Sequence, residues 1–517
     1  MRKRRWGEAG LCGFVMLVLF GVFSTNAVAE MATSFHGFFE SNLVMRDTTG
    51  IQYGFFEEAE AVQQRNILKF DIDIEPNIEW GPIGVEKVHL TFRGAYDSIF
   101  DLRANAYDII DSQGKSRFDY GLRDIRFESD LREAFIDFTY KGNLGRGFFR
   151  PGRQIVSWGE GLLETLNDVI NPPDNSFNLF FQNPDDVKTP LWMGRINYSM
   201  PRLPGFGLNF DLLWIPDIRP TQWGPLDGVR GNTRAGFQAP YVSILPFADL
   251  KGFSVYERVP TNENEYGGKV SAEIGTRLNV SLLYFRDVVN EPGMLLYLAQ
   301  GRAELTHNKQ HVYGGYFSYQ LLAGGMEAVV RGEVSRYTAY PISLASPSVN
   351  FATMVGTTFV YKPVTKTMLA VDKDLRLRWL SKDLTKVSLE WIHTTINEWE
   401  NRLDDVYIDG TGRATGKVGG VTKDRRNIRE QDSFLLQIMT YWWASKLNPT
   451  LLVAYNPGHH GEGATFMVKP SIKWYVTPQF YTDLRLQAFL GDSQASNGFS
   501  NGIKTASEAT LRVGYEW

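Results

Sequence analysis

Cysteine is nearly absent from this sequence. The only one among 517 residues is Cys12, and it lies in an N-terminal segment that we expect to be removed. A mature chain without cysteine has no disulfides, no thiol catalysis, no iron–sulfur cluster and no covalently attached c-type haem. We therefore predict no cofactor.

Long apolar runs are also missing beyond the first 29 residues. Arg2–Arg5 are basic, Leu11–Phe23 are mainly apolar, and Ala27–Ala29 form an Ala-x-Ala cleavage site. This order predicts a secretory signal peptide over residues 1–29 and a mature chain that begins at Glu30. Nothing later supplies the roughly 20 continuous apolar residues of a membrane-spanning helix. We expect a protein exported by the general secretory route without helical spans.

The sequence has no excess of basic residues. It contains 54 Lys and Arg against 58 Asp and Glu, and loss of residues 1–29 removes four basic residues and one acidic residue, which leaves a net charge near −7. This charge argues against a nucleic-acid partner, which needs a clustered basic surface. Aromatic residues, in contrast, make up 14% of the chain, and there are 49 glycines. Such a mixture is typical of a transmembrane β-barrel, in which only every second strand residue is apolar.

The last twelve residues, 506–517, alternate in character and end on an aromatic residue. One side of an extended chain there carries Ser507, Ala509, Leu511, Val513, Tyr515 and Trp517, and the other carries Glu508, Thr510, Arg512, Gly514 and Glu516. A strand that ends the chain on Trp resembles the closing strand of bacterial outer-membrane barrels, and we expect Tyr515 and Trp517 to form an insertion signal. An edge strand of a soluble sheet is the alternative.

Alternating strands recur along the chain, and their connections alternate in length. Nineteen strand candidates are present, whereas a single-chain bacterial barrel with both termini in the periplasm needs an even number. We assign the candidate Phe351–Tyr361 to a long outer loop. Short turns are expected near 142–146, 201–205 and 275–278, and long outer loops near 101–130, 159–189, 217–264, 337–366 and 399–431. The sequence thus predicts one domain over 30–517, an all-β transmembrane antiparallel up-and-down β-barrel of about 18 strands, with 16 as the alternative.

The polar sides of the predicted strands are expected to line a wet interior. The candidate wall residues are Lys69, Arg93, Glu133, Asp137, Glu327, Arg331, Asp483, Arg485 and Arg512. Mixed signs of charge at a pore wall favour polar solutes over apolar ones.

The alternation fails in the fifth strand and the segment after it. Arg150 and Gln154 fall on one side, and Arg153 and Ser157 on the other, so polar groups point both ways. A polar side chain in lipid is costly. A bulge, an interfacial position or a covering segment is therefore expected here.

The same stretch carries a motif of three parts: Gly152–Gln154, Trp158–Glu160, and Ile170–Pro172 with Asp174. With the strand start at Pro190–Met193 and, more weakly, residues 366–380, the sequence resembles a large, poorly characterised family of proteobacterial outer-membrane proteins classed as a domain of unknown function. The resemblance implies a porin-like barrel in the outer membrane of a Gram-negative bacterium. Members are often described as associated with export of lipids or hydrophobic compounds.

In general porins the third loop folds into the barrel and narrows it. By analogy, we expect Arg153, Gln154, Glu160, Asn171 and Asp174 at or beside a constriction. The alternative is that Gly152, Trp158, Gly159 and Pro172 only fix a bulge and a turn.

Other chemistry is poorly supported. His459 and His460 with Glu462 lack a third spaced ligand, so we predict no metal site. The stretch around Ser493 has no downstream histidine, so we predict no enzyme.

Three functions remain open. The leading hypothesis is an outer-membrane channel for passive passage of small polar solutes, narrowed by the third outer loop. The second is a barrel that moves lipids or hydrophobic compounds with a periplasmic partner protein, along an apolar path lined by Phe177, Leu179, Phe180 and Phe181. The third is a sheath for an electron-transfer conduit. All three imply contact with outer-membrane lipid and lipopolysaccharide and with the barrel-assembly machinery.

Overall fold

The computed structural model describes fourteen ranges of the chain. They are residues 32–47, 59–102, 127–162, 165–174, 187–221, 254–260, 262–323, 326–350, 355–400, 406–407, 423–424, 429–457, 464–491 and 507–517. Within them, no helix has the length and apolar character needed to cross a membrane. The predicted signal peptide, His459, His460, Ser493 and the Phe177–Phe181 cluster lie outside the described residues.

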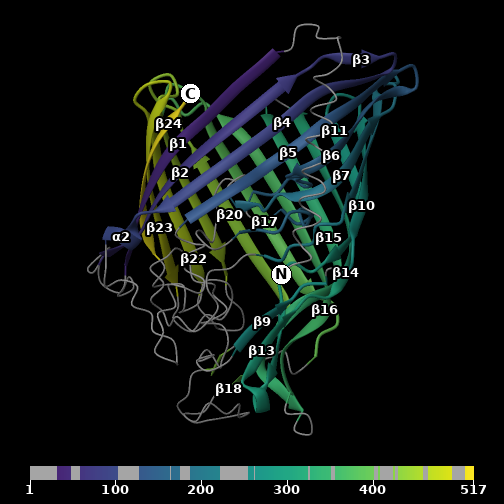
Figure 1. Ribbon diagram of the computed structural model, residues 1–517. Helices are drawn as coiled ribbons and strands as arrows, with labels where there is room; N and C mark the ends of the chain where they lie inside the picture. Colours follow the sequence, from purple (N-terminus) through teal and green to yellow (C-terminus); the bar gives the residue numbers. More distant parts are fainter. Residues whose placement is uncertain are drawn as a thin grey trace.

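Eighteen long strands form one closed antiparallel sheet in the described part of the chain (Figure 1). They are β1 (Ala32–Asp47), β2 (Ala59–Glu75), β4 (Ile83–Asp97), β5 (Phe127–Gly142), β6 (Gly145–Gln154), β7 (Leu191–Ser199), β8 (Phe206–Ile215), β10 (Glu265–Ile274), β11 (Leu278–Val288), β14 (Lys309–Ala323), β15 (Met326–Asn350), β16 (Val355–Leu375), β17 (Thr385–Ile396), β20 (Glu430–Met439), β21 (Leu447–Asn456), β22 (Thr465–Tyr475), β23 (Phe480–Gly491) and β24 (Glu508–Glu516).

The first and last strands close the barrel. β1 pairs with β24 from Phe38 opposite Glu516 to Arg46 opposite Glu508. Trp517 adds two backbone hydrogen bonds to Gly37, with N···O distances of 3.0 and 3.2 Å. The predicted all-β barrel, antiparallel and of eighteen strands, is confirmed.

Side chains on each strand alternate between two surfaces. On β8, Leu212 and Trp214 are 50% and 55% exposed, whereas Asp211, Leu213 and Ile215 are buried. Leu282 on β11 and Leu389 on β17 are likewise more than half exposed. Because the exposed positions are apolar and the buried ones include charges, the apolar side is the outer face and the other side faces the interior.

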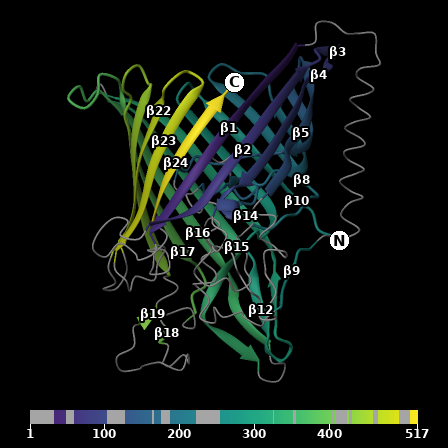
Figure 2. The same cartoon turned by 60° about the vertical axis from the view of Figure 1, so that its left-hand side comes forward.

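A group of short strands, β9 (Ser254–Arg258), β12 (Gly293–Tyr297) and β13 (Arg302–Thr306), extends the barrel at one end. β9 runs parallel to β13, which pairs with β12, and β12 joins β16. Figure 2 shows this group at the opposite end from the C-terminus. The others are β3 (Ile78–Trp80), β18 (Val406–Tyr407), β19 (Lys423–Asp424), α2 (Ile99–Leu102) and η3 (Leu298–Gln300).

The segment predicted as a long outer loop over 337–366 is a paired hairpin in the structure. β15 continues to Asn350 and β16 begins at Val355, so the candidate 351–361 lies largely in the outer half of β16. Tyr340 pairs with Lys362 and Pro341 with Tyr361. Because proline cannot donate a ladder hydrogen bond, it is expected at bulges, and register shifts flank Pro341 on both sides. The pairing of this hairpin with β12 keeps it extended.

Candidate functional site

The segment that follows β6 lies against the inner face of the barrel. We call its described residues, 155–162 and 165–174, the inner segment. Its Val156, Trp158 and Ile170 are buried. They pack in one apolar cluster with the inward-facing residues of β8, β11, β14 and β15, which are Leu213, Ile215, Leu283, Phe285, Val312 and Tyr337.

A second apolar contact joins the inner segment to β16 and β17, on the opposite side of the barrel from β6. Leu166 is fully buried and packs against Met368 and Ala370 on β16 and against Ile392 on β17. These three alternate with exposed outer residues such as Leu369, which is 44% exposed. The inner segment therefore runs from β6 to β17 inside the barrel.

Glu333 on β15 holds the backbone of the inner segment. Its Oε1 accepts the N–H groups of Glu160 and Gly161, the latter at 2.7 Å. Its Oε2 accepts the backbone N–H and the Nδ2–H of Asn167, at 3.3 and 3.2 Å. Glu390 on β17 adds one bond, from the N–H of Leu162 at 2.8 Å. Two wall carboxylates thus replace the backbone partners that an irregular segment lacks.

Trp158 of the motif is a buried anchor. Its Nε1–H donates to Asp211 on β8 at 3.2 Å. Asp211 also receives two hydrogen bonds from Arg195 on β7, at 2.9 and 2.8 Å. The Lys269 ammonium lies 5.5 Å from the Trp158 ring. The indole therefore packs as a large apolar group whose single donor is satisfied.

Asn171 and Pro172 join the two ends of the loop. The Nδ2–H of Asn171 donates to the carbonyl of Thr189 at 2.9 Å, and its Oδ1 accepts the N–H of Val156 at 2.8 Å. Thr189 in turn donates its N–H to the carbonyl of Pro172 at 2.8 Å. Asp174 donates its backbone N–H to the carbonyl of Val187 at 2.5 Å. The Asn-Pro-x-Asp part of the motif thus closes the base of the loop.

Lys188 forms a further tie at this base. Its ammonium donates to Asp168 and to Ser157 of the inner segment. Burial raises the pKa of the Asp168 carboxyl above its usual range, and the nearby Lys188 charge offsets only part of this rise.

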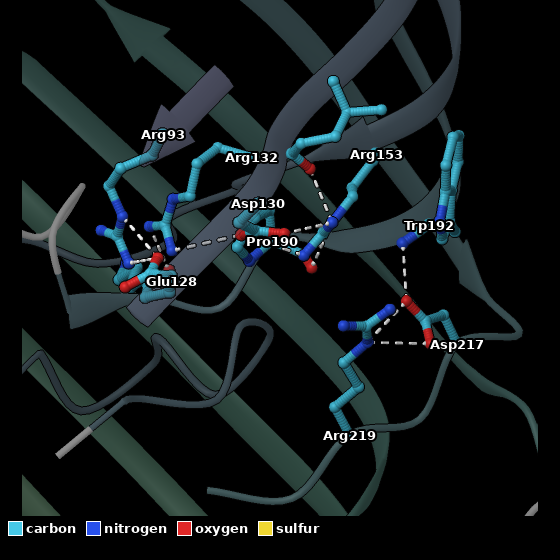
Figure 3. Close-up of polar contacts among 11 residues, drawn as sticks. Arg93, Glu128, Asp130, Arg132, Arg153, Pro190, Trp192, Asp217 and Arg219 are labelled. Carbon is cyan, nitrogen blue, oxygen red and sulfur yellow. Dashed lines mark hydrogen bonds and ion pairs between the residues drawn. The ribbon is translucent and has the colours of Figure 1, made fainter. Parts of the chain in front are cut away.

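Arg153 is buried and fastens three strands. It stands opposite Ala134 on β5 and Trp192 on β7. Its Nη1 donates to Asp130 at 2.8 Å and to the carbonyl of Leu131 at 2.6 Å, and its Nε donates to the carbonyl of Pro190 at 3.2 Å (Figure 3). These bonds satisfy the guanidinium, so the predicted cost of an unpaired polar group is avoided.

Three more guanidinium groups lie beside Asp130 and Glu128. Arg93 donates its Nε–H to Glu128 at 2.7 Å, and Arg65 pairs with the same carboxylate. The Nη1 of Arg132 lies 4.0 Å from Asp130 (Figure 3). Four arginines, Arg153 included, thus gather beside Glu128 and Asp130, and the carboxylates of Asp97 and Asp174 also act on Arg65. Charges of both signs therefore lie close together in this part of the inner wall.

Gly152 is required by the backbone beside this cluster. Its φ is +144°, a conformation that L side chains rarely adopt, and an added Cβ would overlap the carbonyl oxygen of Ala134. Gly159 is similar, with φ +112°, where a Cβ would meet Thr165 and Glu333. These two glycines let the strand end and the inner segment turn against the wall.

The other predicted site residues fall into separate groups. Near the motif, Glu133 accepts the N–H of Ile155 at 2.9 Å, Asp137 pairs with Arg150 at 2.6 Å, and Gln154 is buried and donates to the Arg150 carbonyl at 3.0 Å. Elsewhere on the wall, Arg331 pairs with Asp372 at 2.5 Å and Arg485 with Asp483 at 2.7 Å. The structure brings Glu133, Asp137, Arg153, Gln154 and Asn171 together around the base of the loop.

Sequence reasoning missed the wall carboxylates that hold the inner segment. Glu333, Glu390 and Asp211 were not among the predicted site residues. The alternation contained a signal for one of them, because Glu333 shares the inward side of its strand with Arg331. Their partners lie 53 to 228 residues away along the chain, which no local pattern reveals.

The outer face carries an apolar hollow beside the motif. Its volume is about 400 Å³. The residues around it are Ile136, Phe138, Phe149, Pro151, Gly152, Trp192, Met193, Gly194, Ile196, Leu212, Leu213, Trp214 and Pro216. Two glycines and a proline on neighbouring strands leave this gap among larger apolar side chains.

Comparison with known proteins places the chain by family rather than by function. None of the curated proteins matches it. Among solved structures it is similar to Acinetobacter baumannii OccAB4, at 8% identity and a TM-score of 0.49, covering 96% of this chain and 100% of that one. It is also similar to A. baumannii OccAB1, at 11% identity, a TM-score of 0.48 and coverage of 96% and 98%.

The chain is also similar to Pseudomonas aeruginosa OccK9 (OpdG), at 11% identity and a TM-score of 0.47, covering 94% of this chain and 98% of that one. A family model matches residues 65–517, which include all the motif residues described above. The chain therefore belongs to the family described as "Protein of unknown function (DUF1302)".

Proposed function

We propose that this protein is an outer-membrane channel for passive passage of small polar solutes. A barrel of this size leaves an aqueous channel unless something fills it. The described inner wall carries charges of both signs, among them Arg93, Arg331 and Asp483, whereas the outer face is apolar. Such a distribution suits a barrel embedded in lipid around a wet interior.

The observation that carries the proposal is the set of hydrogen bonds by which the carboxylates of Glu333 and Glu390 hold the backbone of the inner segment. A segment tied to wall strands on the far side of the interior narrows the path left for solutes. The motif residues Arg153, Gln154, Glu160, Asn171 and Asp174 then act chiefly by fixing this narrowing, and the charges of both signs on the wall beside Arg93 favour polar solutes.

Solute entry into vesicles tests the proposal. Vesicles that contain the refolded barrel should swell in isotonic solutions of small sugars and amino acids, and more slowly with larger solutes. Empty vesicles and vesicles with a barrel of known small pore are the controls. Swelling no faster than in empty vesicles, with the barrel shown to be folded, contradicts the proposal.

The apolar hollow supports a second candidate, a barrel that moves hydrophobic molecules with a periplasmic partner. The hollow has room for a hydrocarbon tail and lies on the outer face next to Gly152, where the paired part of β6 ends. Gly194→Leu would fill it, since a Cβ at Gly194 meets only Phe149 at 3.5 Å and Trp214 at 4.0 Å. Slower transfer of a fluorescent fatty acid by this variant, with unchanged swelling, would favour the second candidate.

A further inference from the structure

A row of polar side chains crosses three neighbouring strands on the inner face. Tyr266 on β10 pairs with Arg286 on β11, so the adjoining positions place Glu265 beside Asp287. On the next strand, β14, Gln310 pairs with Asp287. All three row residues are buried, at 2%, 2% and 4% exposure.

The row brings two carboxyl groups into contact. Glu265 and Asp287 lie within hydrogen-bond reach of each other. Like charges at facing strand positions repel. Nothing basic offsets them, because among the described residues no Lys or Arg is paired with either carboxylate. Arg219 pairs with Asp217 at 3.0 Å, and Arg286 pairs with Glu263 at 3.0 Å.

Oxygen atoms in the row lack partners. One Gln310 hydrogen bond is present, from Nε2 to Asp287 Oδ2 at 2.6 Å, and Glu265 Oε1 accepts the N–H of Val288 at 3.1 Å. Asp287 Oδ1 and Gln310 Oε1 are buried without a hydrogen-bond partner. A buried acceptor without a partner costs free energy, and a buried uncompensated charge costs more. A cation bound between the two carboxyl groups would offset both costs.

We propose that Glu265, Asp287 and Gln310 bind a calcium ion. Calcium prefers carboxylate and amide oxygens, tolerates irregular geometry and completes its shell with water. It would neutralise both carboxylates and engage the two unpartnered oxygens. The inference departs from the sequence-based prediction of no metal site, because the three ligands come from three strands and no spacing in the sequence joins them.

The site would brace the wall behind the inner segment. Asn290, three residues beyond Asp287, donates its Nδ2–H to the carbonyl of Val169 at 3.1 Å. Asp287 also lies two residues from Phe285, which belongs to the apolar cluster under Trp158. Calcium binding thus stabilises the strands on which the inner segment rests.

Calorimetric titration of the refolded, lipopolysaccharide-free barrel with calcium chloride tests the proposal. We expect one site with a Kd of about 10⁻⁴ to 10⁻³ M, the range of extracellular calcium modules, and weaker binding of magnesium. Glu265→Gln and Asp287→Asn should each weaken binding at least tenfold. Asp483→Asn is the matched control, since Asp483 is equally buried but its Oδ2 is already paired with Arg485 Nη2 at 2.5 Å.

A gain-of-function variant guards against variants that fail to fold. Gln310→Glu adds a third carboxylate, so it should bind calcium more tightly than the wild type, and calcium should raise its Tm. If Glu265 and Asp287 instead share a proton, the wild type binds no calcium at calcium concentrations 10-fold above the expected Kd range. In that case Gln310→Glu is less stable than the wild type both with and without calcium. Equal binding by Glu265→Gln, Asp287→Asn and the wild type would place the ion elsewhere. Either result overturns the proposal.

Discussion

Replacing Glu333 by Gln should loosen the inner segment without unfolding the barrel. Glutamine keeps the shape of the side chain, and its Oε1 still accepts the N–H groups of Glu160 and Gly161. Its Nε2 is a donor, however, and faces the two N–H donors of Asn167 that Glu333 Oε2 accepts at 3.3 and 3.2 Å. Two charge-assisted bonds are therefore lost.

The magnitude follows from the geometry of those bonds. Both are long, so we assign about 1 to 1.5 kcal/mol to each, near the lower end for bonds to a charged group. The loss of about 2 to 3 kcal/mol makes local opening about 30- to 150-fold more frequent. Amide hydrogen exchange of residues 160–167, measured by mass spectrometry on the refolded barrel, should accelerate by that factor.

The control is Glu327→Gln, because Glu327 is an exposed acid on the same strand. It should leave exchange in residues 160–167 unchanged. If Glu333→Gln also leaves it unchanged, or accelerates exchange equally along all strands, then Glu333 does not hold the inner segment and the reasoning fails.

Three further predictions concern the motif and the inner segment. Gly152→Ala should prevent folding, which would be seen as loss of the heat-modifiable band on a gel. The control Gly194→Ala should fold, since its Cβ meets nothing closer than 3.5 Å. A folded Gly152→Ala barrel would refute the need for a positive φ at this position. Trp158→Phe should lower the free energy of unfolding in urea by about 1 to 2 kcal/mol through loss of the Nε1 hydrogen bond, and an unchanged midpoint would contradict this. The pKa of Asp168 is above 3.8 in the folded state, so the folded state holds that proton more firmly than the unfolded state, and the free energy of unfolding falls as pH rises from about 4. Asp168→Asn should remove this part of the pH dependence of the free energy of unfolding, and an identical pH dependence in the variant and the wild type would refute it.

The barrel was predictable because the alternation of apolar and polar residues along each strand can be read from neighbouring positions in the sequence. Strand residues alternate between lipid and interior, so Leu511, Val513 and Tyr515 identify the closing strand without knowledge of any distant contact. The failure of alternation around Arg153 also pointed to the right place, and Gly152 with its positive φ shows the cause. The outer hairpin was missed because Pro341 resembles a loop residue, and only pairing across bulges makes it part of a strand.

The site was predictable only in part, because its contacts are long-range. Asn171 and Pro172 close the loop over 15 to 18 residues, and the motif indicated them. The hydrogen bond from the Glu160 N–H to Glu333 joins positions 173 residues apart. The side-by-side placement of Glu265, Asp287 and Gln310 is set by the register of β10, β11 and β14. Register and lumen contacts arise from closure of the whole barrel, which a single sequence does not specify locally.

The central claim is that a polar channel passes the inner segment, and single-channel conductance in a planar bilayer tests it most directly. The wild type should show steps of stable conductance, and Glu333→Gln should show larger or noisier steps because its inner segment opens more often. Conductance absent from well-folded wild-type barrels would contradict the channel. Steps identical in the two proteins would show that the segment held by Glu333 does not narrow the path.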